Sequence, residues 1–398
     1  MRILYTTEQY PPCQTGVALA DYGLSLALAQ AGHEVFVCTG QHPQATQEGE
    51  IVRLESGRVC KEAALLAPRL WVLRFDVGWD WSKSQQPIGA EVKDYVEFVL
   101  NFDCALLLNS GIIGKWNCDL LYQVLPQAKA KVKFLRSHGE KELIGFKYSL
   151  KDRFKDLLRS LRTGRLQKPY MLWLNQELQR SLKHYDKVFF LHEDTHGYAP
   201  LKPFCRQVGI LPNGVFAKDI CPPKNFKPTF LLNVSNYFVS KGQDFVLKAY
   251  YLSQTSLPLK LIGALEEGQT LEKLKALKAQ LDKEHGKKEV EFLYKIPREQ
   301  VLQAFKEACI FLHASHFEAF PMVILECLQF ATPFVCTDVG NVAKIAPHLI
   351  AHTPQEMADK IDTLLNDPTH YAEVSKALRT RAQDFCYENI AKGLLTQC

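Results

Sequence analysis

Short apolar runs alternate with longer helical patterns along the whole chain, and this alternation constrains the fold more than any other feature of the sequence. It is typical of βαβ units, whose parallel strands are covered on both faces by the helices that connect them. The segments expected to be strands are 3–5, 35–37, 105–108, 132–135, 188–191, 230–234, 259–262, 290–293 and Val335. The alternation therefore predicts an α/β protein with parallel sheets.

A proline-rich stretch divides the chain into two halves. The 398 residues are too many for one typical core and suit two domains. Pro222-Pro223 and Pro228 form a stiff polar segment, after which strands and helices begin to alternate again. We therefore expect one domain over residues 1–221 and a second over 222–375. Two Rossmann-like halves form a cleft, and ligands of such sheets bind beyond the carboxyl ends of the strands.

The composition is that of a soluble globular protein, with 47% hydrophobic and 23% charged residues. No apolar run approaches the roughly 18 residues needed to span a bilayer. The first residues enter a strand pattern and do not resemble a signal peptide. These features predict a cytoplasmic protein. The net charge of +5 is modest, and no nucleic-acid recognition motif is present, so no nucleic-acid partner is expected.

The twelve cysteines are expected to be reduced. Cys38, Cys104, Cys309 and Cys336 lie in or beside apolar strand-like runs, and no Cys-x-x-Cys pair occurs. This placement favours small buried residues in a reducing compartment, with a structural zinc site as the weaker alternative.

The stretch 309–330 carries the clearest functional signal, because it reads as a strand, a turn and a helix with two carboxylates. The turn residues Phe320, Pro321, Met322 and Val323 would lie at the helix N-terminus, where unpaired N–H groups and the helix dipole favour an anion such as phosphate. Glu318 lies before this turn.

Glu326 lies about one turn deeper in the helix, and a carboxylate there suits two vicinal hydroxyls such as those of a ribose. Glu318 would face another hydroxylated group. The anion-binding turn, Glu326 and Glu318 would then match the diphosphate, the ribose and the sugar of a nucleotide sugar. The alternative is that both glutamates are ordinary solvated carboxylates flanking an apolar helix.

With Asp338-Val339-Gly340 after it, this stretch resembles the glutamate-x7-glutamate signature of family 4 glycosyltransferases, which are retaining enzymes of the GT-B fold. The resemblance implies that Glu318 approaches the donor sugar, that the turn amides hold the diphosphate and that Glu326 binds the ribose. It also implies a GT-B fold in which two Rossmann-like domains face each other across a cleft. The N-terminal domain would bind the acceptor and the C-terminal domain the donor, and residues 376–398 would cross back to the N-terminal domain.

Two loops of the C-terminal half extend the resemblance. The family places an arginine and then a Lys-Gly pair on the donor diphosphate. Lys241-Gly242 matches the pair, whereas Asn236 stands where the arginine is expected. A neutral amide cannot supply the second charge, so donor affinity would be lower unless another cation substitutes.

Gly263, Lys295 and Ile296 fall in strand ends and loops that the family places near the donor, and Arg298 follows in the same loop. Either Lys295 or Arg298 could supply the missing charge. The alternative for each lysine, including Lys241, is a solvated side chain.

In the N-terminal half, Gly16 precedes a helix and could let the backbone approach a phosphate or sugar. The family has a Gly-Gly pair where this chain has Thr15-Gly16, and a turn without a ligand stays an alternative. His138 follows the predicted strand 132–135, where a parallel sheet exposes its active groups. The family carries a histidine after the equivalent strand, near the transferred sugar, which implies that His138 binds or polarises hydroxyls. A structural histidine is the alternative.

No metal or cofactor is expected. The sequence has no Asp-x-Asp motif, and Asp103, Asp119 and His192 have no partner at ligand spacing. No obvious nucleophile is present either. In retaining GT-B enzymes the leaving phosphate is thought to accept the acceptor proton, which agrees with that absence.

Residues 141–168 carry nine Lys and Arg against three Asp and Glu, with apolar residues three or four apart. This pattern predicts an amphipathic basic helix of the kind that lies on an anionic membrane surface, with an ordinary core-packing helix as the alternative. It favours a lipid-linked acceptor and a peripheral membrane location.

The sequence thus predicts a nucleotide-sugar-dependent, retaining glycosyltransferase of the hexosyltransferase type. Its substrate would be a UDP- or GDP-linked sugar, and its acceptor a glycolipid, lipopolysaccharide or polysaccharide precursor. Two alternatives stay open: a nucleotide-sugar hydrolase or epimerase of the same fold, and a non-catalytic subunit with weakened donor binding.

Overall fold

The computed structural model describes residues 1–45, 50–80, 87–139 and 170–398. The chain forms two compact units. Unit 1 contains Met1–Pro212 together with Tyr387–Cys398, and unit 2 contains Asn213–Cys386. This division lies near the predicted boundary at 221–222, but the chain returns to unit 1 only at Tyr387, after the predicted 376. The predicted basic helix over 141–168 lies outside the described residues.

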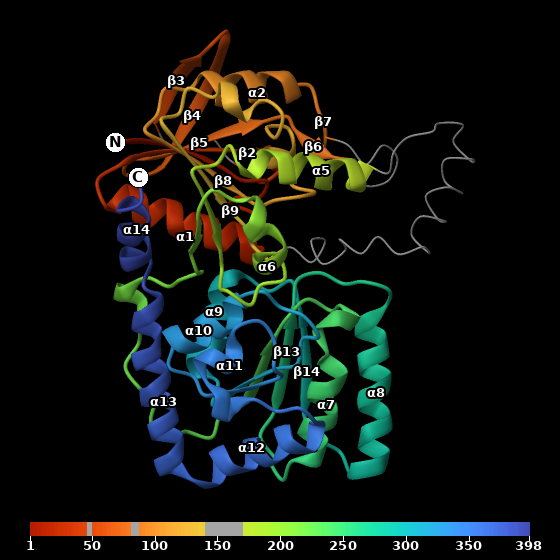
Figure 1. Cartoon of the computed structure of the whole chain (residues 1–398). Helices are drawn as coiled ribbons and strands as arrows, with labels where there is room; N and C mark the ends of the chain where they lie inside the picture. Colours follow the sequence, from red (N-terminus) through yellow and green to blue (C-terminus); the bar gives the residue numbers. More distant parts are fainter. Residues whose placement is uncertain (46–49, 81–86, 140–169) are drawn as a thin grey trace, which may run out of the picture. The chain divides into compact units, whose positions relative to one another are not determined.

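Unit 1 consists of the following elements, with η for 3-10 helices (Figure 1): β1 Arg2–Thr6, α1 Gly16–Gln30, β2 Glu34–Gly40, β3 Ile51–Ser56, β4 Val59–Ala67, β5 Leu70–Phe75, β6 Gly78–Trp79, β7 Pro87–Ile88, α2 Val92–Asn101, β8 Leu106–Ser110, α3 Trp116–Asp119, η1 Leu125–Gln127, β9 Val132–Arg136, α5 Tyr170–Leu182, β10 Lys187–Phe190, α6 Tyr198–Leu201, η3 Lys202–Phe204, β11 Val208–Ile210 and α14 Tyr387–Leu395.

The main sheet of unit 1 has the strand order β11-β10-β9-β8-β1-β2-β5-β4-β3. The strands from β11 to β5 pair in parallel, as the alternation predicts. β4 and β3 continue the sheet in antiparallel fashion. The predicted α/β fold with parallel sheets is confirmed, and at this edge the sheet also contains an antiparallel meander, β3 to β5, that was not predicted. Helices α1 and α2 cover parts of the sheet (Figure 1).

The return of the chain to unit 1 depends on a close helix contact. α14 packs on α1 (Figure 1), and the Tyr387 hydroxyl donates to the carbonyl oxygen of Ala20 at 3.3 Å. A Cβ atom added at Gly23 would lie 2.2 Å from the Tyr387 ring. Only glycine at position 23 therefore leaves room for this ring.

Unit 2 consists of η4 Ala217–Asp219, β12 Leu231–Val234, η5 Val239–Lys241, α7 Gln243–Leu252, β13 Leu259–Gly263, α8 Thr270–His285, β14 Val290–Tyr294, α9 Arg298–Glu307, β15 Ile310–His313, α10 Met322–Gln329, β16 Phe334–Cys336, α11 Val342–Ile345, η6 Pro347–Leu349, α12 Pro354–Asn366, α13 Pro368–Ala382 and η7 Gln383–Phe385 (Figure 1).

The sheet of unit 2 has the order β14-β13-β12-β15-β16, and every pair of neighbours is parallel. The order reverses its direction around β12, so the loops after β12 and β15 leave neighbouring strands at the same edge. In open α/β sheets this is the position at which ligands bind.

The proline-rich segment is fixed to unit 2 by Lys224. Its ammonium group donates to the carbonyl oxygens of Phe305 and Ala308 at 2.9 and 3.0 Å, and its backbone N–H donates to Ser375 Oγ at 2.7 Å. Burial lowers the pKa of Lys224 to about 8. The lysine between the prolines therefore anchors the segment and is not a solvated side chain.

Candidate functional site

The loop after β12 in unit 2 lies directly against the loop after β15. The Ser240 carbonyl oxygen accepts a hydrogen bond from the N–H of His316 at 2.9 Å. Gly242 has a φ of 62°, and a Cβ atom there would lie 2.0 Å from the carbonyl oxygen of Ala314. The Lys-Gly pair thus has a physical reason: the glycine permits the close approach, and the approach carries Lys241 to Glu318.

Glu318 lies between two basic side chains. Lys241 Nζ is 2.6 Å from Glu318 Oε1, and His313 Nε2 is 3.5 Å from the same oxygen. Burial alone would raise the pKa of Glu318, but His313 and Lys241 outweigh burial and lower it to about 2. Glu318 is therefore ionised at neutral pH and held in one orientation.

His313 is a site residue that the sequence analysis missed. It ends the buried strand β15, is 1% exposed, and lies parallel to the ring of Phe311 with 6.1 Å between the ring centroids. Its place at the carboxyl end of a strand, five residues before Glu318, was the available signal.

The turn before α10 has the geometry expected for an anion site. Pro321 is the N-cap, and no side chain caps the helix. The N–H groups of Ile324 and Leu325 donate to the carbonyl oxygen of Pro321, whereas the N–H groups of Met322 and Val323 have no acceptor among the described residues. These N–H groups and the dipole of α10 favour a negatively charged ligand.

Phe320 and Gly340 hold this turn in place. The carbonyl oxygen of Phe320 accepts from Asn213 Nδ2 at 3.1 Å, and its ring contacts Phe385 edge to face. Gly340 has a φ of 58°, and a Cβ atom there would lie 2.6 Å from the carbonyl oxygen of Ala319. Phe320 itself is 5% exposed, so it supports the turn from within the core.

Glu326 is buried in α10 and forms an ion pair with Arg298 at the start of α9. The exposed fractions of the two side chains are 5% for Glu326 and 24% for Arg298. Burial raises the pKa of Glu326, and Arg298 opposes that rise. The second carboxylate oxygen, Oε2, is buried and accepts no hydrogen bond from the described residues. Glu326 thus presents one unused acceptor, and the solvated alternative is excluded.

Asn236 has a structural role in unit 2. Its Oδ1 accepts from the N–H groups of Ala264 and Leu265 at 3.4 and 3.1 Å, and its carbonyl oxygen accepts from Gln243 Nε2 at 2.8 Å. The side chain therefore joins the loop after β12 to the loop after β13. An arginine side chain could not accept these two bonds, which gives the departure at this position a physical explanation.

The remaining predicted donor residues lie at the ends of β13 and β14. A Cβ atom at Gly263 would lie 2.7 Å from the Tyr237 ring and 2.9 Å from the Ser235 carbonyl oxygen, so this glycine is required for packing. Lys295 has a φ of 56°, its N–H donates to the Gly263 carbonyl oxygen at 2.8 Å, and its ammonium group lies over the Tyr294 ring. Ile296 is half-buried beside it.

Unit 1 contains a second cluster of polar side chains at the carboxyl ends of β1, β8 and β9. At its centre is Asp21 of α1, which is fully buried. Burial alone would raise the pKa of Asp21, but His138 and Arg136 lower it well below its ordinary value. The donors around this carboxylate are Tyr5, Thr7, Ser110 and Arg136.

His138 belongs to this cluster. Its Nε2 lies 2.6 Å from Ser110 Oγ and 3.2 Å from Asp21 Oδ1, and its side chain is 8% exposed. His138 was predicted from the sequence, whereas Asp21, Arg136 and Ser110 were not. An aspartate in an otherwise apolar helix and an arginine ending an apolar strand were the signals for the first two.

Gly16 is the first residue of α1, and Thr15 is the N-cap of that helix. Thr15 Oγ1 accepts from the N–H of Ala18 at 3.3 Å and donates to Gln9 Oε1 at 2.6 Å. Thr15 in place of a glycine therefore stabilises the helix start. Gly16 is exposed beside it.

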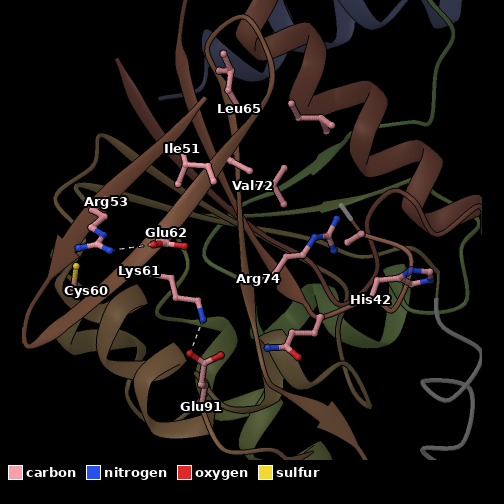
Figure 2. A pocket seen from close by; sticks show the side chains of 14 residues that line it. His42, Ile51, Arg53, Cys60, Lys61, Glu62, Leu65, Val72, Arg74 and Glu91 are labelled. Carbon is pink, nitrogen blue, oxygen red and sulfur yellow. Dashed lines mark hydrogen bonds and ion pairs between the residues drawn. The ribbon is translucent and has the colours of Figure 1, made fainter. Parts of the chain in front are cut away.

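Unit 1 also has a hollow of about 600 Å³ on the meander β3 to β5 (Figure 2). Its lining includes the apolar residues Ile51, Leu65 and Val72 and the ion pairs Arg53–Glu62 and Lys61–Glu91. Arg74, on the same wall, donates to the carbonyl oxygens of Gly40 and Pro11. Arg74 therefore ties the loop before α1 to strand β5. The hollow contains no residue of the two clusters above.

No group of three or more His, Cys, Asp and Glu side chains in the described ranges is arranged to hold a metal ion. Asp103 and His192 lie outside both clusters, and Asp119 is buried, where its Oδ2 accepts from the N–H of Gly114. All twelve cysteines are free thiols. Among the described residues, no helix is long and apolar enough to cross a bilayer.

Part of the chain is similar in sequence to a known protein family. Residues 220–383 match the family described as glycosyl transferases group 1. An uncharacterized glycosyltransferase of Haemophilus influenzae is 30% identical over 182 residues, which are 42% of this chain and 48% of that protein. The gpi3 subunit of a phosphatidylinositol N-acetylglucosaminyltransferase of Schizosaccharomyces pombe is 26% identical over 46% of this chain and 40% of that protein. The chain thus matches about half or less of the length of these curated relatives.

Solved structures resemble the chain over its whole length. A sucrose-phosphate synthase of Thermosynechococcus elongatus has a TM-score of 0.69 at 17% identity and covers 100% of this chain and 98% of its own. Anabaena HepE, solved with UDP and glucose, has a TM-score of 0.66 at 15% identity with the same coverage. These neighbours are GT-B glycosyltransferases, so the predicted GT-B fold is confirmed. The matched family and the names of the relatives support the prediction of a glycosyltransferase.

Proposed function

We propose that this chain transfers a sugar from a nucleoside diphosphate sugar to a hydroxyl group with retention of the anomeric configuration. Its unit 2 matches the group 1 glycosyl transferases, and its fold is GT-B. The observation that carries the proposal is the arrangement in unit 2. There, Lys241 and Glu318 pair beside the uncapped N-terminus of α10, and Glu326 lies within the same helix.

Lys241 and the N–H groups of Met322 and Val323 would bind the donor diphosphate. The negative charge on that group grows as the bond to the sugar breaks, and preorganised donors stabilise such developing charge. The ammonium group has three protons, so it can contact both Glu318 and a phosphate oxygen. Asn236 adds no charge, and we assign the stabilisation to Lys241 and the helix terminus.

Glu318 would accept hydrogen bonds from the hydroxyls of the donor sugar. Its pKa of about 2 keeps it an acceptor across the physiological range. Glu326 Oε2 would accept from a ribose hydroxyl, while Oε1 stays paired with Arg298. Gly263, Lys295 and Ile296 would line the side of the site nearest the base. Because two neighbours were solved with UDP-linked compounds, UDP-sugars are the first donors to test.

The leaving phosphate would accept the proton of the attacking hydroxyl, which requires no protein nucleophile. His138, and the backbone near Gly16, would contact the sugar or the acceptor from unit 1. Retention of configuration and the absence of a divalent metal requirement are parts of this proposal that rest on the family resemblance.

The acceptor proposed is a glycolipid, lipopolysaccharide or polysaccharide precursor at the cytoplasmic face of a membrane. The support is the basic amphipathic pattern over 141–168 in the sequence. We expect the protein to co-sediment with phosphatidylserine vesicles at low salt and to be released at high salt, because the attraction is electrostatic. Equal sedimentation with uncharged phosphatidylcholine vesicles would contradict an electrostatic attachment.

Product analysis tests the proposed reaction. The full-length protein is incubated with a nucleotide sugar, with and without a mixture of lipid-linked and glycan acceptors, and the products are resolved by mass spectrometry and proton NMR. A glycosylated product with the anomeric configuration of the donor is expected. Free sugar irrespective of acceptor would indicate a hydrolase, an altered nucleotide sugar an epimerase, and unchanged donor a non-catalytic protein.

A further inference from the structure

Unit 1 buries an ion pair that the proposed reaction does not itself require. Asp21 and Arg136 are each 0% exposed, and Arg136 Nη1 lies 3.0 Å from Asp21 Oδ1. Burying two charges is costly even when they are paired, so a gain in stability does not by itself explain why this pair is present. It lies at the carboxyl ends of β1, β8 and β9, at the edge of the sheet where ligands bind.

The hydrogen bonds around Asp21 determine where the proton of His138 is. The Ser110 hydroxyl donates its one proton to Asp21 Oδ1 at 2.7 Å. Its oxygen can therefore only accept from His138 Nε2, which lies 2.6 Å away. Asp21 Oδ1, at 3.2 Å from the same nitrogen, is an acceptor as well. Two acceptors facing Nε2 require that this nitrogen carries a hydrogen.

We propose that Asp21, acting through Ser110, is a positioning residue that holds His138 in one orientation with the proton on Nε2. In the neutral imidazole this tautomer has its lone pair on Nδ1. The contact of His138 with sugar or acceptor rests on the proposed function, whereas its tautomer does not.

One serine variant and one tyrosine variant form a matched pair for the test. The Tyr5 and Ser110 hydroxyls each donate to Asp21 Oδ1 at 2.7 Å, but only Ser110 also contacts His138. Ser110→Ala and Tyr5→Phe thus remove equivalent bonds to the carboxylate. Asp21→Asn is less suitable, because it leaves Arg136 buried without its counter-charge.

The first measurement is the tautomer of His138 in 15N-histidine-labelled protein by two-bond proton–nitrogen correlation spectra. The signal is assigned by its loss in His138→Gln. We expect a single Nε2-protonated form in the wild type, in Tyr5→Phe and in the conservative Ser110→Thr. In Ser110→Ala the nearer acceptor is lost and Nε2 keeps the longer contact to Asp21 Oδ1 at 3.2 Å, so we expect a smaller fraction of the Nε2-protonated form. An Nδ1-protonated wild type, or identical spectra for Ser110→Ala and Tyr5→Phe, would overturn the proposal.

The second measurement is kinetic and uses the donor identified by product analysis. Loss of one hydrogen bond that orients His138 is expected to lower kcat about fivefold in Ser110→Ala with little change in donor KM, whereas Tyr5→Phe stays within about twofold of the wild type. Equal kcat values for the two variants would overturn the positioning role. If no transfer occurs with any donor, the proposed function fails while the NMR result still decides the tautomer.

Discussion

Replacement of Lys241 by methionine is expected to lower kcat for sugar transfer about 10²- to 10³-fold, the range measured when one preorganised donor to a developing anion is removed. The side chain of methionine fills a similar volume but carries no charge, so the diphosphate would depart without its cation. Glu318 would also lose its nearest partner, at 2.6 Å, and part of the effect that lowers its pKa. Steady-state rates at saturating donor measure the effect.

Lys248→Met is the matched control. Lys248 lies on α7 in the same unit, and its exposed ammonium group pairs with Asp244 at 3.1 Å, one turn earlier in the helix. We expect its kcat to equal that of the wild type. Unfolding by urea should show both variants folded. A Lys241→Met enzyme that retains the wild-type kcat would remove Lys241 from the proposed leaving-group site.

Arg298→Met is expected to destabilise unit 2 by about 3 kcal/mol, at the lower end of the range for breaking one half of a buried ion pair. Glu326 is 5% exposed and would keep its burial without its cation. Because Arg298 is partly exposed, we expect the loss of stability to lie at the lower end of that range. Urea unfolding monitored by circular dichroism gives the free energy of unfolding.

The pH dependence of this variant has a definite sign. Burial raises the pKa of Glu326 in the folded protein, and removal of Arg298 would raise it further. The folded state then holds a proton that the unfolded state has released, so stability falls as pH rises above the ordinary range of a glutamate. We expect the variant to be closer to the wild type at pH 5 than at pH 8.

The double variant Arg298→Met with Glu326→Met provides the control for this prediction. Because no buried charge is left unpaired, it should recover most of the stability that Arg298→Met loses. A single variant as stable as the wild type at pH 8 would show that Glu326 does not depend on Arg298. A double variant less stable than the single one would point to a packing defect instead.

Most of the parallel strands could be predicted from the sequence because burial on both faces makes them continuous apolar runs, as in 259–262 and 310–312, whereas the parallel strands β5 and β11 were missed. β3 and β4 were missed for the converse reason. Exposed and partly buried residues alternate along Ile51–Ser56, and Arg53 and Glu55 interrupt the apolar pattern. Gly57, with a φ of 63° between β3 and β4, was the hairpin signal that the sequence offered.

Part of the candidate site could likewise be predicted from the sequence, and part could not. Glu318, the turn at Pro321 and Glu326 lie in one continuous segment, so the local pattern of strand, turn and helix was enough to predict their order. Their partners come from other segments. Arg298 reaches Glu326 from another helix, and Asp21 reaches His138 across the sheet of unit 1. Such pairs depend on strand order, which local patterns do not specify.

Asn236 illustrates a limit of motif comparison. From the sequence it was a missing cation, whereas the structure gives its side chain two backbone N–H groups to accept from. The geometry of the loop after β12 therefore depends on the residue that departs from the family pattern. Its effect on donor affinity stays a prediction.

Titration calorimetry of the full chain with UDP, GDP, ADP and their sugar conjugates tests the central claim most directly, because the claim requires a nucleotide site in unit 2. We predict that one nucleotide binds at one site per chain and that Glu326→Ala, while folded, weakens this binding at least about tenfold through loss of the ribose contact. No binding of any of these ligands at millimolar concentration, or equal affinity in Glu326→Ala, would contradict the account.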